Sequence, residues 1–370
     1  MTDTDAGPLQ GIVVADFSRV LAGPYATMLL GDLGAEVIKV ERPGQGDDTR
    51  AWGPPYTEQG QSTYFAGVNR NKSTCALDLG TAEGRAAARD LALSADVVIE
   101  NFKPGALDRM GLGYAELARQ HPGLVYCSIT GFGSGAGRDL PGYDLLVQAM
   151  GGLMSITGPG PGEPTKAGVA LVDVITGLHA TVGILAALRH RDATGEGQHV
   201  EVNLLSSLLS ALVNQSSGYV AAGVVPGILG NAHPSIAPYD VFATGDRPLV
   251  IAVGNDGQFA ALVATLGAPE LAAHPDYATN PARVAHREDL KARLEELLAS
   301  RGADEWQRQI TQAGVPCGPI NDLAQAFELA SALGLEPVVE VDGTPTVAHP
   351  ITLSQTPATY RSGPPDLPSD

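Results

Sequence analysis

Short apolar strands alternate with helical segments from the start of the chain, and this alternation constrains the fold more than any other feature. Residues 11–17 form an apolar run typical of a buried strand, and residues 36–40 form another. Between them, Ala22-Gly23-Pro24 leads into a helical segment that ends near Gly34, a residue suited to closing a helix. Parallel strands need such a crossover between them. The pattern therefore predicts an α/β fold with a parallel sheet.

The same alternation continues through the first 224 residues. Further strands are expected at 74–77, 96–100, 124–129 and 198–203. Helices are expected at 81–94, 105–110, 114–120, 145–153, 173–190 and 204–222. The pattern then changes, because residues 224–239 are rich in Gly and Pro and show no clear period.

These changes divide the chain into three parts. Residues 1–224 are predicted to form a large parallel-sheet domain that ends in a linker helix. Residues 225–320 are predicted to form a smaller α/β domain, and its elements are a strand at 249–253 and helices at 257–266, 287–300 and 303–313. Residues 321–370 carry one helix and a strand at 337–341, and we expect this C-terminal segment to return to the large domain.

Composition disfavours several classes of function. The 370 residues carry a net charge of −18 without a long basic run, which argues against nucleic acid as a partner. The longest uncharged stretch, 202–239, is interrupted by polar residues, and the N-terminus is acidic, so we expect neither a membrane span nor a signal peptide. The 3 cysteines lie far apart, and the sequence has no Cys-x-x-Cys or His-x-x-His pair. A reduced, cytoplasmic protein without a metal site is therefore expected.

One carboxylate, Asp173, lies within an otherwise apolar run at 169–175. Burying an unpaired carboxylate is costly, so this side chain needs partners. Apolar residues recur at helical spacing from Asp173 onward, which places it at or near a helix N-terminus, where free N–H groups and the helix dipole favour a negative charge. Two compatible interpretations stay open, an N-cap aspartate and an ionised carboxylate used as a nucleophile.

Polar residues also follow two of the predicted strands, at the edge where parallel sheets place ligands. Arg42 follows the strand at 36–40 and suits either a phosphate or adenine contact or a solvated strand end. Residues 100–109 bring an amide, an aromatic ring and two cations together, although Arg109 can equally form a surface ion pair. The Gly131-Phe132-Gly133 segment lacks the following helix and acidic residue of a dinucleotide fingerprint, so nicotinamide binding is disfavoured.

Two histidines differ in what their positions suggest. His179 lies about one and a half helical turns from Asp173, so the two share no face and His179 is expected to pack rather than act as a base. His233 lies in the loop at 230–239, where a functional role is harder to dismiss.

Taken together, a set of short motifs resembles those of the family III CoA-transferases of the CaiB/BaiF type, the group that includes formyl-CoA transferase and the carnitine CoA-transferases. The likeness covers nearly the whole chain. The motifs are Asp16-Phe17, Ala22-Gly23-Pro24, the run 34–41, Asn71-Lys72-Ser73, Asn101-Phe102-Lys103-Pro104-Gly105, Thr130-Gly131-Phe132-Gly133, Pro141-Gly142-Tyr143-Asp144, the run 173–177 and the turn 314–319.

The resemblance implies a Rossmann-like large domain, a small domain, and a homodimer whose two subunits interlock like links of a chain. It also implies that CoA binds to the large domain as part of the substrate, with no permanently bound cofactor. Asp173 matches the catalytic aspartate of the family. The positions that match its CoA contacts are Val20, Ala22, Arg42, Leu77, Asn101, Phe102, Ala106 and Arg109.

The implied activity is the transfer of CoA from an acyl-CoA to a small carboxylic acid. In that mechanism Asp173 attacks the thioester to form a mixed anhydride, becomes an aspartyl-CoA thioester, and passes CoA to the incoming acid through a second anhydride. Because each of these intermediates hydrolyses readily, the site must exclude water.

Two departures from the relatives narrow the function. The same fold hosts α-methylacyl-CoA racemases, which use a histidine in a Gly-His-Asp run, whereas this chain has Gly142-Tyr143-Asp144 and no base near neutral pH at the middle position. The glycine run of formyl-CoA transferases corresponds here to 230–239, which disfavours the oxalate/formate pair. We expect succinyl-CoA as the donor and a dicarboxylic or aryl-substituted acid as the acceptor, with His233 and Ser235 as contacts to the acid. A racemase and a non-catalytic CoA-binding protein stay open as alternatives.

Overall fold

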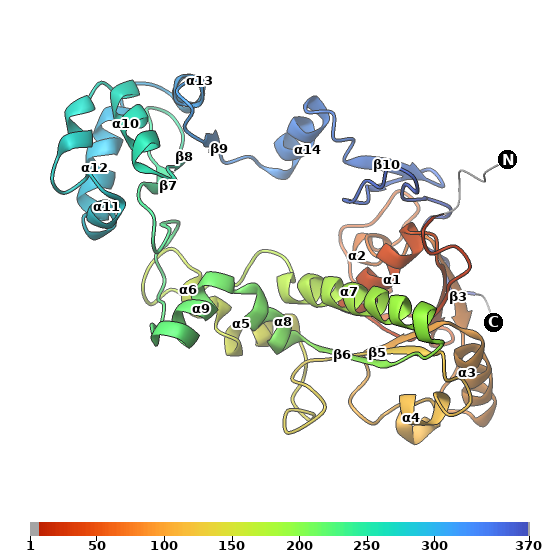
Figure 1. Cartoon of the computed structure of the whole chain (residues 1–370). Helices are drawn as coiled ribbons and strands as arrows, with labels where there is room; N and C mark the ends of the chain where they lie inside the picture. Colours follow the sequence, from red (N-terminus) through yellow and green to blue (C-terminus); the bar gives the residue numbers. More distant parts are fainter. Residues whose placement is uncertain (1–6, 369–370) are drawn as a thin grey trace. The chain divides into compact units, whose positions relative to one another are not determined.

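The computed structural model describes residues 7–368, and its larger sheet has six strands that pair in parallel throughout (Figure 1). The strands are β1 Val13–Asp16, β2 Glu36–Glu41, β3 Lys72–Ala76, β4 Val97–Glu100, β5 Val125–Thr130 and β6 His199–Asn203. Their spatial order is β3-β2-β1-β4-β5-β6, which is the order of a doubly wound Rossmann-type sheet. The predicted α/β fold with a parallel sheet is therefore confirmed.

Helices cover both faces of this sheet. Their bounds are α1 Ala22–Asp32, α3 Ala82–Ser94, α4 Tyr114–Leu117, α7 Leu171–Thr194 and α8 Leu204–Ala211. Successive side chains of a strand point to opposite faces, so Val14 and Ala15 of β1 enter different cores. The core that contains Val14 includes residues of α1, α7 and α8, whereas the core that contains Ala15 includes residues of α3 and α4.

α7 is long and apolar enough, by length and composition, to cross a membrane. In this fold it instead packs on α1 and on the sheet, and Ala180, Ile184 and Ala187 from it are completely or almost completely buried in the first core. The apolar character of α7 is thus that of a helix in a protein interior.

Shorter elements complete the region around the large sheet. They are α2 Thr63–Ala66, α5 Asp144–Met150, α9 Val213–Ala222, the 3₁₀ helices η1 Asp48–Ala51 and η2 Asp108–Met110, and the hairpin of β10 Val338–Val341 and β11 Thr344–Val347. The short helix α6 Leu153–Ile156 begins in this region, but its residues from Met154 onward group with the second compact unit. The helix expected at 204–222 is divided into α8 and α9, and Val213 at the division has a positive φ of 37°. The segment expected as a helix at 105–110 forms only the 3₁₀ turn η2, which ends at Gly111 with φ 73°.

A second sheet of three antiparallel strands lies in the order β7-β8-β9. The elements of this region are β7 Tyr239–Phe242, β8 Leu249–Ala252, α10 Asp256–Thr265, η3 Pro269–Ala273, α11 Asn280–Ala285, α12 Arg287–Leu298, α13 Ala303–Gln312, β9 Cys317–Pro319 and α14 Leu323–Ala332. It has its own core, which includes Phe242, Phe259 and Trp306. The strands β7 and β9 were not expected from the sequence, because each is at most four residues long and borders Pro.

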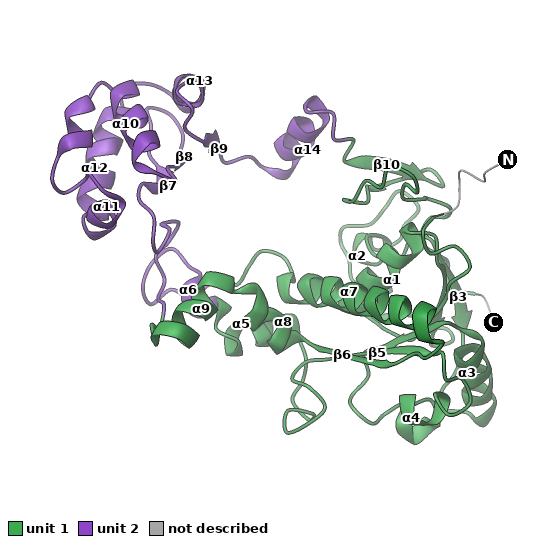
Figure 2. Cartoon of the chain, viewed as in Figure 1, with its two compact units in different colours: residues 1–153, 166–225, 336–370 green, residues 154–165, 226–335 purple. Residues whose placement is uncertain are grey.

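The chain divides into two compact units (Figure 2). The first contains the residues up to Leu153, Lys166–Val225 and the residues from Glu336 onward, and the second contains Met154–Thr165 and Pro226–Leu335. This division differs from the expected one in two places. Residues 154–165 group with the second unit rather than with the large sheet, and residues 321–335, including α14, also belong to the second unit.

Hydrogen bonds around the buried Arg70–Asp32 ion pair hold the C-terminal segment to the rest of the first unit. Arg70 donates to both carboxylate oxygens of Asp32, at 2.9 and 2.6 Å, and its third nitrogen donates to the carbonyl of Val347 at 2.8 Å. His349 Nδ1 lies 3.0 Å from the same carboxylate. The backbone N–H of Arg361 donates to Asn71 Oδ1 at 2.6 Å.

Candidate active site

Asp173 lies in the first turn of α7, at the third position of the helix. α7 begins at Leu171, and its N-cap residue is Ala170, which has no side chain able to cap. The interpretation of Asp173 as an N-cap aspartate is therefore wrong, although its expected place near a helix N-terminus is correct.

The helix is capped instead by Asp144, the first residue of α5. Its Oδ1 accepts hydrogen bonds from the backbone N–H groups of Val172, at 2.8 Å, and of Asp173, at 3.2 Å. Its Oδ2 accepts a hydrogen bond of 2.5 Å from Gln148, whose own Oε1 accepts the N–H of Ala167 at 2.8 Å. Asp144 thus joins the start of α7 to the segment that precedes it, and it occupies the N–H groups that would otherwise stabilise the Asp173 carboxylate.

The pKa of Asp173 differs from the value that a position near a helix N-terminus predicts. Burial of the carboxyl group and then the negative charge of Asp144 raise the pKa of Asp173 to about 7. Burial also raises the pKa of Tyr64, and the charges of Asp173 and Asp144 raise it further. We expected the helix terminus to favour the ionised form of Asp173, but burial and then the charge of Asp144 favour the neutral form, and the N–H groups of Val172 and Asp173 are already paired with Asp144.

Asp173 lines a cavity of about 260 Å³ at the carboxyl edge of the large sheet. Residues that follow β1, β4 and β5 form its walls. Four of the expected CoA contacts line it together with Asp173, and they are Val20, Ala22, Asn101 and Phe102. The cavity lies at the switch point between β1 and β4, where doubly wound sheets bind their ligands.

A second cavity of about 300 Å³ follows the ends of β1, β2 and β3. Arg42 and Leu77 line it, and Phe102 and Arg19 line both cavities. Arg42 is exposed and donates to Gln45 Oε1 at 2.7 Å. The structure therefore brings six of the eight expected CoA contacts around two cavities that share a wall.

The other two expected contacts, Ala106 and Arg109, line neither cavity. Both follow β4 in the segment that includes η2, and Arg109 is exposed. Among the described residues, 7–368, no carboxylate pairs with Arg109 within 4.0 Å, so this cation has no ion-pair partner in the first unit.

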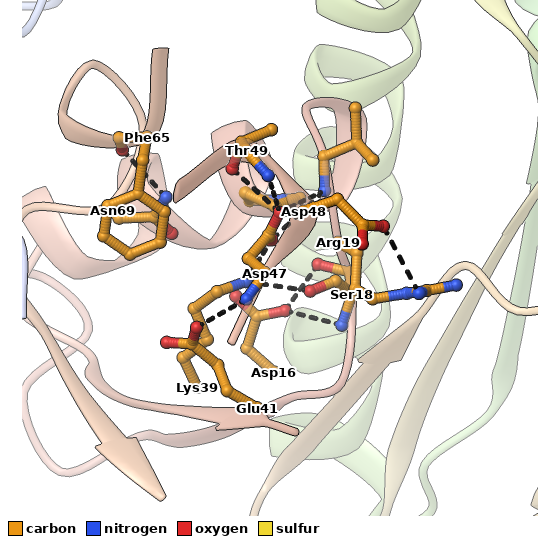
Figure 3. Close-up of polar contacts among 12 residues, drawn as sticks. Asp16, Ser18, Arg19, Lys39, Glu41, Asp47, Asp48, Thr49, Phe65 and Asn69 are labelled. Carbon is orange, nitrogen blue, oxygen red and sulfur yellow. Dashed lines mark hydrogen bonds and ion pairs between the residues drawn. The ribbon is translucent and has the colours of Figure 1, made fainter. Parts of the chain in front are cut away.

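Sequence reasoning missed Arg19 and the buried charges around it. The Arg19 guanidinium lies 5.3 Å from the centre of the Phe102 ring, and its Nε is buried without a hydrogen-bond partner. The buried ion pair of Lys39 with Asp47, at 3.0 Å, is drawn in the same close-up as Arg19 (Figure 3). A second buried ion pair joins Lys72 to Asp16 at 3.2 Å. Asp16, Lys39 and Lys72 belong to motifs that carried the resemblance, but the spacing of those motifs gave the charges no role.

The pKa values in this cluster follow from opposing effects. Burial favours the neutral form of Asp16, but the ammonium groups of Lys72 and Lys39 outweigh it and hold the pKa of that carboxyl below its usual value. Burial likewise favours the neutral form of Lys72 and lowers its pKa to about 8, although Asp16 acts in the opposite direction. Asp16 and Lys72 are thus largely ionised near neutral pH, and Asp16 also accepts the N–H of Ser18, which fixes the polypeptide after β1.

Glycines let the Asp144 segment approach the end of β5. A Cβ on Gly131 would lie 2.4 Å from the Cα of Gly142, so neither position has room for a side chain. This close contact places Tyr143 and Asp144 beside the cavity, where both line its wall. The Gly131-Phe132-Gly133 segment therefore serves packing at this edge.

His179 and His233 both lie outside the wall of the cavity that Asp173 lines. His179 Nδ1 lies 3.1 Å from the hydroxyl of Ser207, and His179 does not line the cavity of Asp173. His233 lies in the second unit, and its Nδ1 accepts the N–H of Ser235 at 3.1 Å. In the part of the chain that the structure describes, no cluster of three or more His, Cys, Asp or Glu side chains is arranged to hold a metal ion.

A doubly wound sheet with two cavities at its switch point defines an α/β enzyme that binds its ligand at that edge. The model of CoA-transferase family III matches residues 9–370, and the chain belongs to this family. It is 46% identical to a succinate–glutarate CoA-transferase of Agrobacterium fabrum, over 97% of this chain and 93% of that protein. It is 42% identical to an acetyl-CoA:oxalate CoA-transferase of Acetobacter aceti, over 94% of this chain and 90% of that protein.

A solved structure of this family has the same fold. A CAIB/BAIF family protein from Brucella suis is 44% identical and superposes with a TM-score of 0.87, over 98% of this chain and 97% of that chain. The resemblance found in the sequence is therefore confirmed, and the chain is an acyl-CoA:carboxylate CoA-transferase.

Proposed function

We propose that the protein moves CoA from an acyl-CoA to a carboxylic acid through covalent intermediates on Asp173. The observation that carries this proposal is the half-buried carboxylate of Asp173 in the wall of the cavity that Val20, Ala22, Asn101 and Phe102 also line. A cavity that holds a carboxylate beside expected CoA contacts can bring a thioester carbonyl to a nucleophile.

The steps balance without a cofactor. An Asp173 oxygen attacks the thioester carbonyl, the carbon–sulfur bond breaks, and CoA leaves as a thiolate from the mixed anhydride. The thiolate then attacks the Asp173 carbonyl carbon and expels the donor acid as its carboxylate, which leaves an aspartyl-CoA thioester. The incoming carboxylate repeats the two steps in reverse, so the acceptor leaves as its CoA thioester and Asp173 is restored.

The site supports this chemistry through its environment. Burial and Asp144 raise the pKa of Asp173 to about 7, so a large share of the group is ionised at neutral pH and reacts as a comparatively basic carboxylate. The low polarity that raises this pKa also limits the water that could hydrolyse an anhydride.

The substrates are a narrower part of the proposal. We propose succinyl-CoA as the donor and a dicarboxylic or aryl-substituted acid as the acceptor, with glutarate first among the acids to test because of the relative from Agrobacterium fabrum. We also propose that His233 and Ser235 of the loop 230–239 contact the acid. Arg287 supports the shape of that loop, since it donates to the carbonyls of His233 and Pro234 at 3.1 and 3.0 Å.

The assembly and location are proposals of the same kind. We propose a cytoplasmic homodimer with interlocked subunits and CoA bound on the first unit, near Arg42, Leu77, Ala106 and Arg109. Size-exclusion chromatography with light scattering measures the subunit number, and a monomer would contradict the dimer.

The decisive experiment combines the Asp173→Asn variant with chemical trapping. Wild-type protein incubated with succinyl-CoA and hydroxylamine should lose activity and acquire a hydroxamate on Asp173, which peptide mass spectrometry detects. Asp173→Asn should lack turnover but still bind CoA. Turnover by Asp173→Asn, or inactivation without modification of Asp173, would sink the proposal.

Exchange of hydrogen with deuterium from the solvent distinguishes a racemase from the proposed transferase. A racemase exchanges the α-hydrogen of a 2-methylacyl-CoA, whereas the transferase does not. Within residues 7–368, no histidine lines the cavity of Asp173, so the cavity lacks the histidine that a racemase uses as its second base.

A further inference from the structure

The connection between β1 and α1 is strained where it meets the two cavities. Arg19 lines both cavities and Val20 lines that of Asp173. Val20 has φ 69°, a conformation that β-branched residues rarely adopt. Strain of this kind persists only where the surroundings over-determine the backbone, and it concentrates at functional sites.

Three consecutive residues of this connection are each held by a different side chain. Lys39 Nζ donates to the carbonyl of Ser18 at 2.9 Å. Asn101 accepts the N–H of Arg19 at 2.9 Å and donates to its carbonyl at 2.7 Å. The N–H of Val20 is directed at both carboxylate oxygens of Asp47, at 3.2 and 3.3 Å.

Asp47 is itself fixed from β2. Its carboxylate forms an ion pair of 3.0 Å with Lys39, and neither side chain is exposed to solvent. Its backbone N–H donates to Glu41 Oε2 at 2.8 Å, and Glu41 in turn forms two hydrogen bonds of 2.7 Å with Arg50. The position of the Asp47 carboxylate is therefore set by contacts from β2 and from Glu41, and not only by the connection that it holds.

We propose that Asp47 is a positioning residue for CoA binding, which together with Lys39 holds Val20 in its left-handed conformation and so shapes the wall shared by the two cavities. This inference rests on the proposed function, which gives Val20 its contact with CoA. In this role Asp47 accepts the backbone N–H of Val20 and does not itself contact CoA.

The same connection reaches the helix that carries the nucleophile. It leads directly into α1, and a Cβ on Gly177 would lie 2.6 Å from the carbonyl oxygen of Ala22. Gly177 follows Asp173 by one helical turn on the same face of α7. A change in the backbone at Val20 could therefore be passed through Ala22 to the second turn of α7.

The test measures the dissociation constant of CoA by titration calorimetry, with folding checked by circular dichroism. Asp47→Asn keeps the size of the side chain but loses the charge, and we expect CoA affinity to fall about tenfold because Val20 relaxes out of its strained conformation. Val20→Gly removes the side chain of an expected CoA contact, so the affinity of this variant is itself the reference. In that background Asp47→Asn should lower CoA affinity by less than about threefold, because glycine adopts a positive φ without strain.

A matched control distinguishes this smaller effect from a general gain in stability. Glu336 also has a positive φ, 47°, and is exposed, so Glu336→Gly relieves strain away from the cavities. We expect the loss of CoA affinity caused by Asp47→Asn to be unchanged in the Glu336→Gly background. An equally reduced loss in the Glu336→Gly background, an undiminished loss in the Val20→Gly background, or unaltered CoA affinity in Asp47→Asn would each overturn the proposal.

Two further outcomes are informative. If Asp47→Asn does not fold because Lys39 is left buried and unpaired, the double variant Asp47→Asn/Lys39→Met removes both charges of the pair, and its loss of CoA affinity should again be smaller in the Val20→Gly background than in the wild type. Wild-type protein that fails to bind CoA would overturn the proposed function and this inference together. Wild-type binding with an unaffected Asp47→Asn would overturn the inference alone.

Discussion

Replacing Asp144 with Asn removes one of the two negative charges at the start of α7 while keeping an oxygen that can accept from Val172 and Asp173. The helix cap should therefore survive, because Asn is as effective as Asp in this role. Burial of Asp173 is unchanged by the substitution, so only the part of its raised pKa that comes from Asp144 is lost.

The size of the expected shift in the pKa of Asp173 follows from the loss of one neighbouring negative charge. The pKa of Asp173 is raised to about 7, first by burial and then by Asp144. Loss of a neighbouring like charge should lower it by about one unit, which corresponds to about 1.4 kcal/mol. At pH 6 the ionised fraction would rise from about one tenth to about one half, so the rate at pH 6 relative to the plateau should rise about fivefold.

The assay is the initial rate of CoA transfer at saturating substrates from pH 5 to pH 9. In the proposed mechanism only the ionised carboxylate attacks, so the activity of the wild type should fall as the pH drops through about 7. We expect the midpoint of this acidic limb to move to lower pH in Asp144→Asn. An unmoved midpoint, or one that moves to higher pH, would refute the electrostatic reasoning.

Asp246 offers a matched control in the second unit. Its carboxylate also caps a helix from outside, since it accepts the N–H of Ala303, the first residue of α13, at 2.8 Å. Asp246→Asn makes the same chemical change without a nucleophile on the capped helix. A shift of the acidic limb equal to that of Asp144→Asn would show that the effect is not local to Asp173.

Three other variants test the structure. The pKa of Asp173 is raised on folding, so its contribution to stability is present below the unfolded pKa and lost as the pH rises through about 7. The free energy of unfolding of Asp173→Asn, measured with urea, should therefore exceed that of the wild type by about 1–3 kcal/mol at pH 8 and by progressively less toward pH 4. Gly177→Ala places a Cβ 2.6 Å from the carbonyl oxygen of Ala22 and should cost about 1–3 kcal/mol, seen as a lower melting temperature; an unchanged value would contradict the tight contact of α1 with α7. Arg70→Met leaves Asp32 buried without its main partner and should cost about 3–5 kcal/mol, with faster proteolysis of the C-terminal segment; equal resistance to protease would argue that Arg70 does not hold it.

Local patterns in the sequence were sufficient to predict the large sheet. β1, α1 and β2 lie within one or two residues of their expected bounds, because strand and helix periods are properties of neighbouring residues. The same reasoning failed where an element is short or depends on distant partners. β9 is such a case, since Cys317–Pro319 becomes a strand only by pairing with β8.

The surroundings of Asp173 were beyond local reasoning for a related physical reason. Asp144 is 29 residues away in the sequence, and only the close contact of Gly131 with Gly142 brings it to the start of α7. A carboxylate at a helix N-terminus is usually stabilised by free N–H groups. Here another carboxylate takes those groups first, and no pattern around Asp173 could reveal that competition.

The raised pKa has a consequence for the direction of the proposed reaction. In the mixed anhydride, the thiolate can attack the donor carbonyl and expel Asp173, which only reverses the first step, or attack the Asp173 carbonyl and expel the donor acid. The less basic carboxylate leaves more readily. Asp173, with a pKa of about 7, is more basic than an ordinary carboxylic acid, whose pKa is about 4.3. Attack at the Asp173 carbonyl is therefore favoured, so the charge on Asp144 promotes formation of the aspartyl-CoA thioester as well as setting the pH at which the first attack occurs.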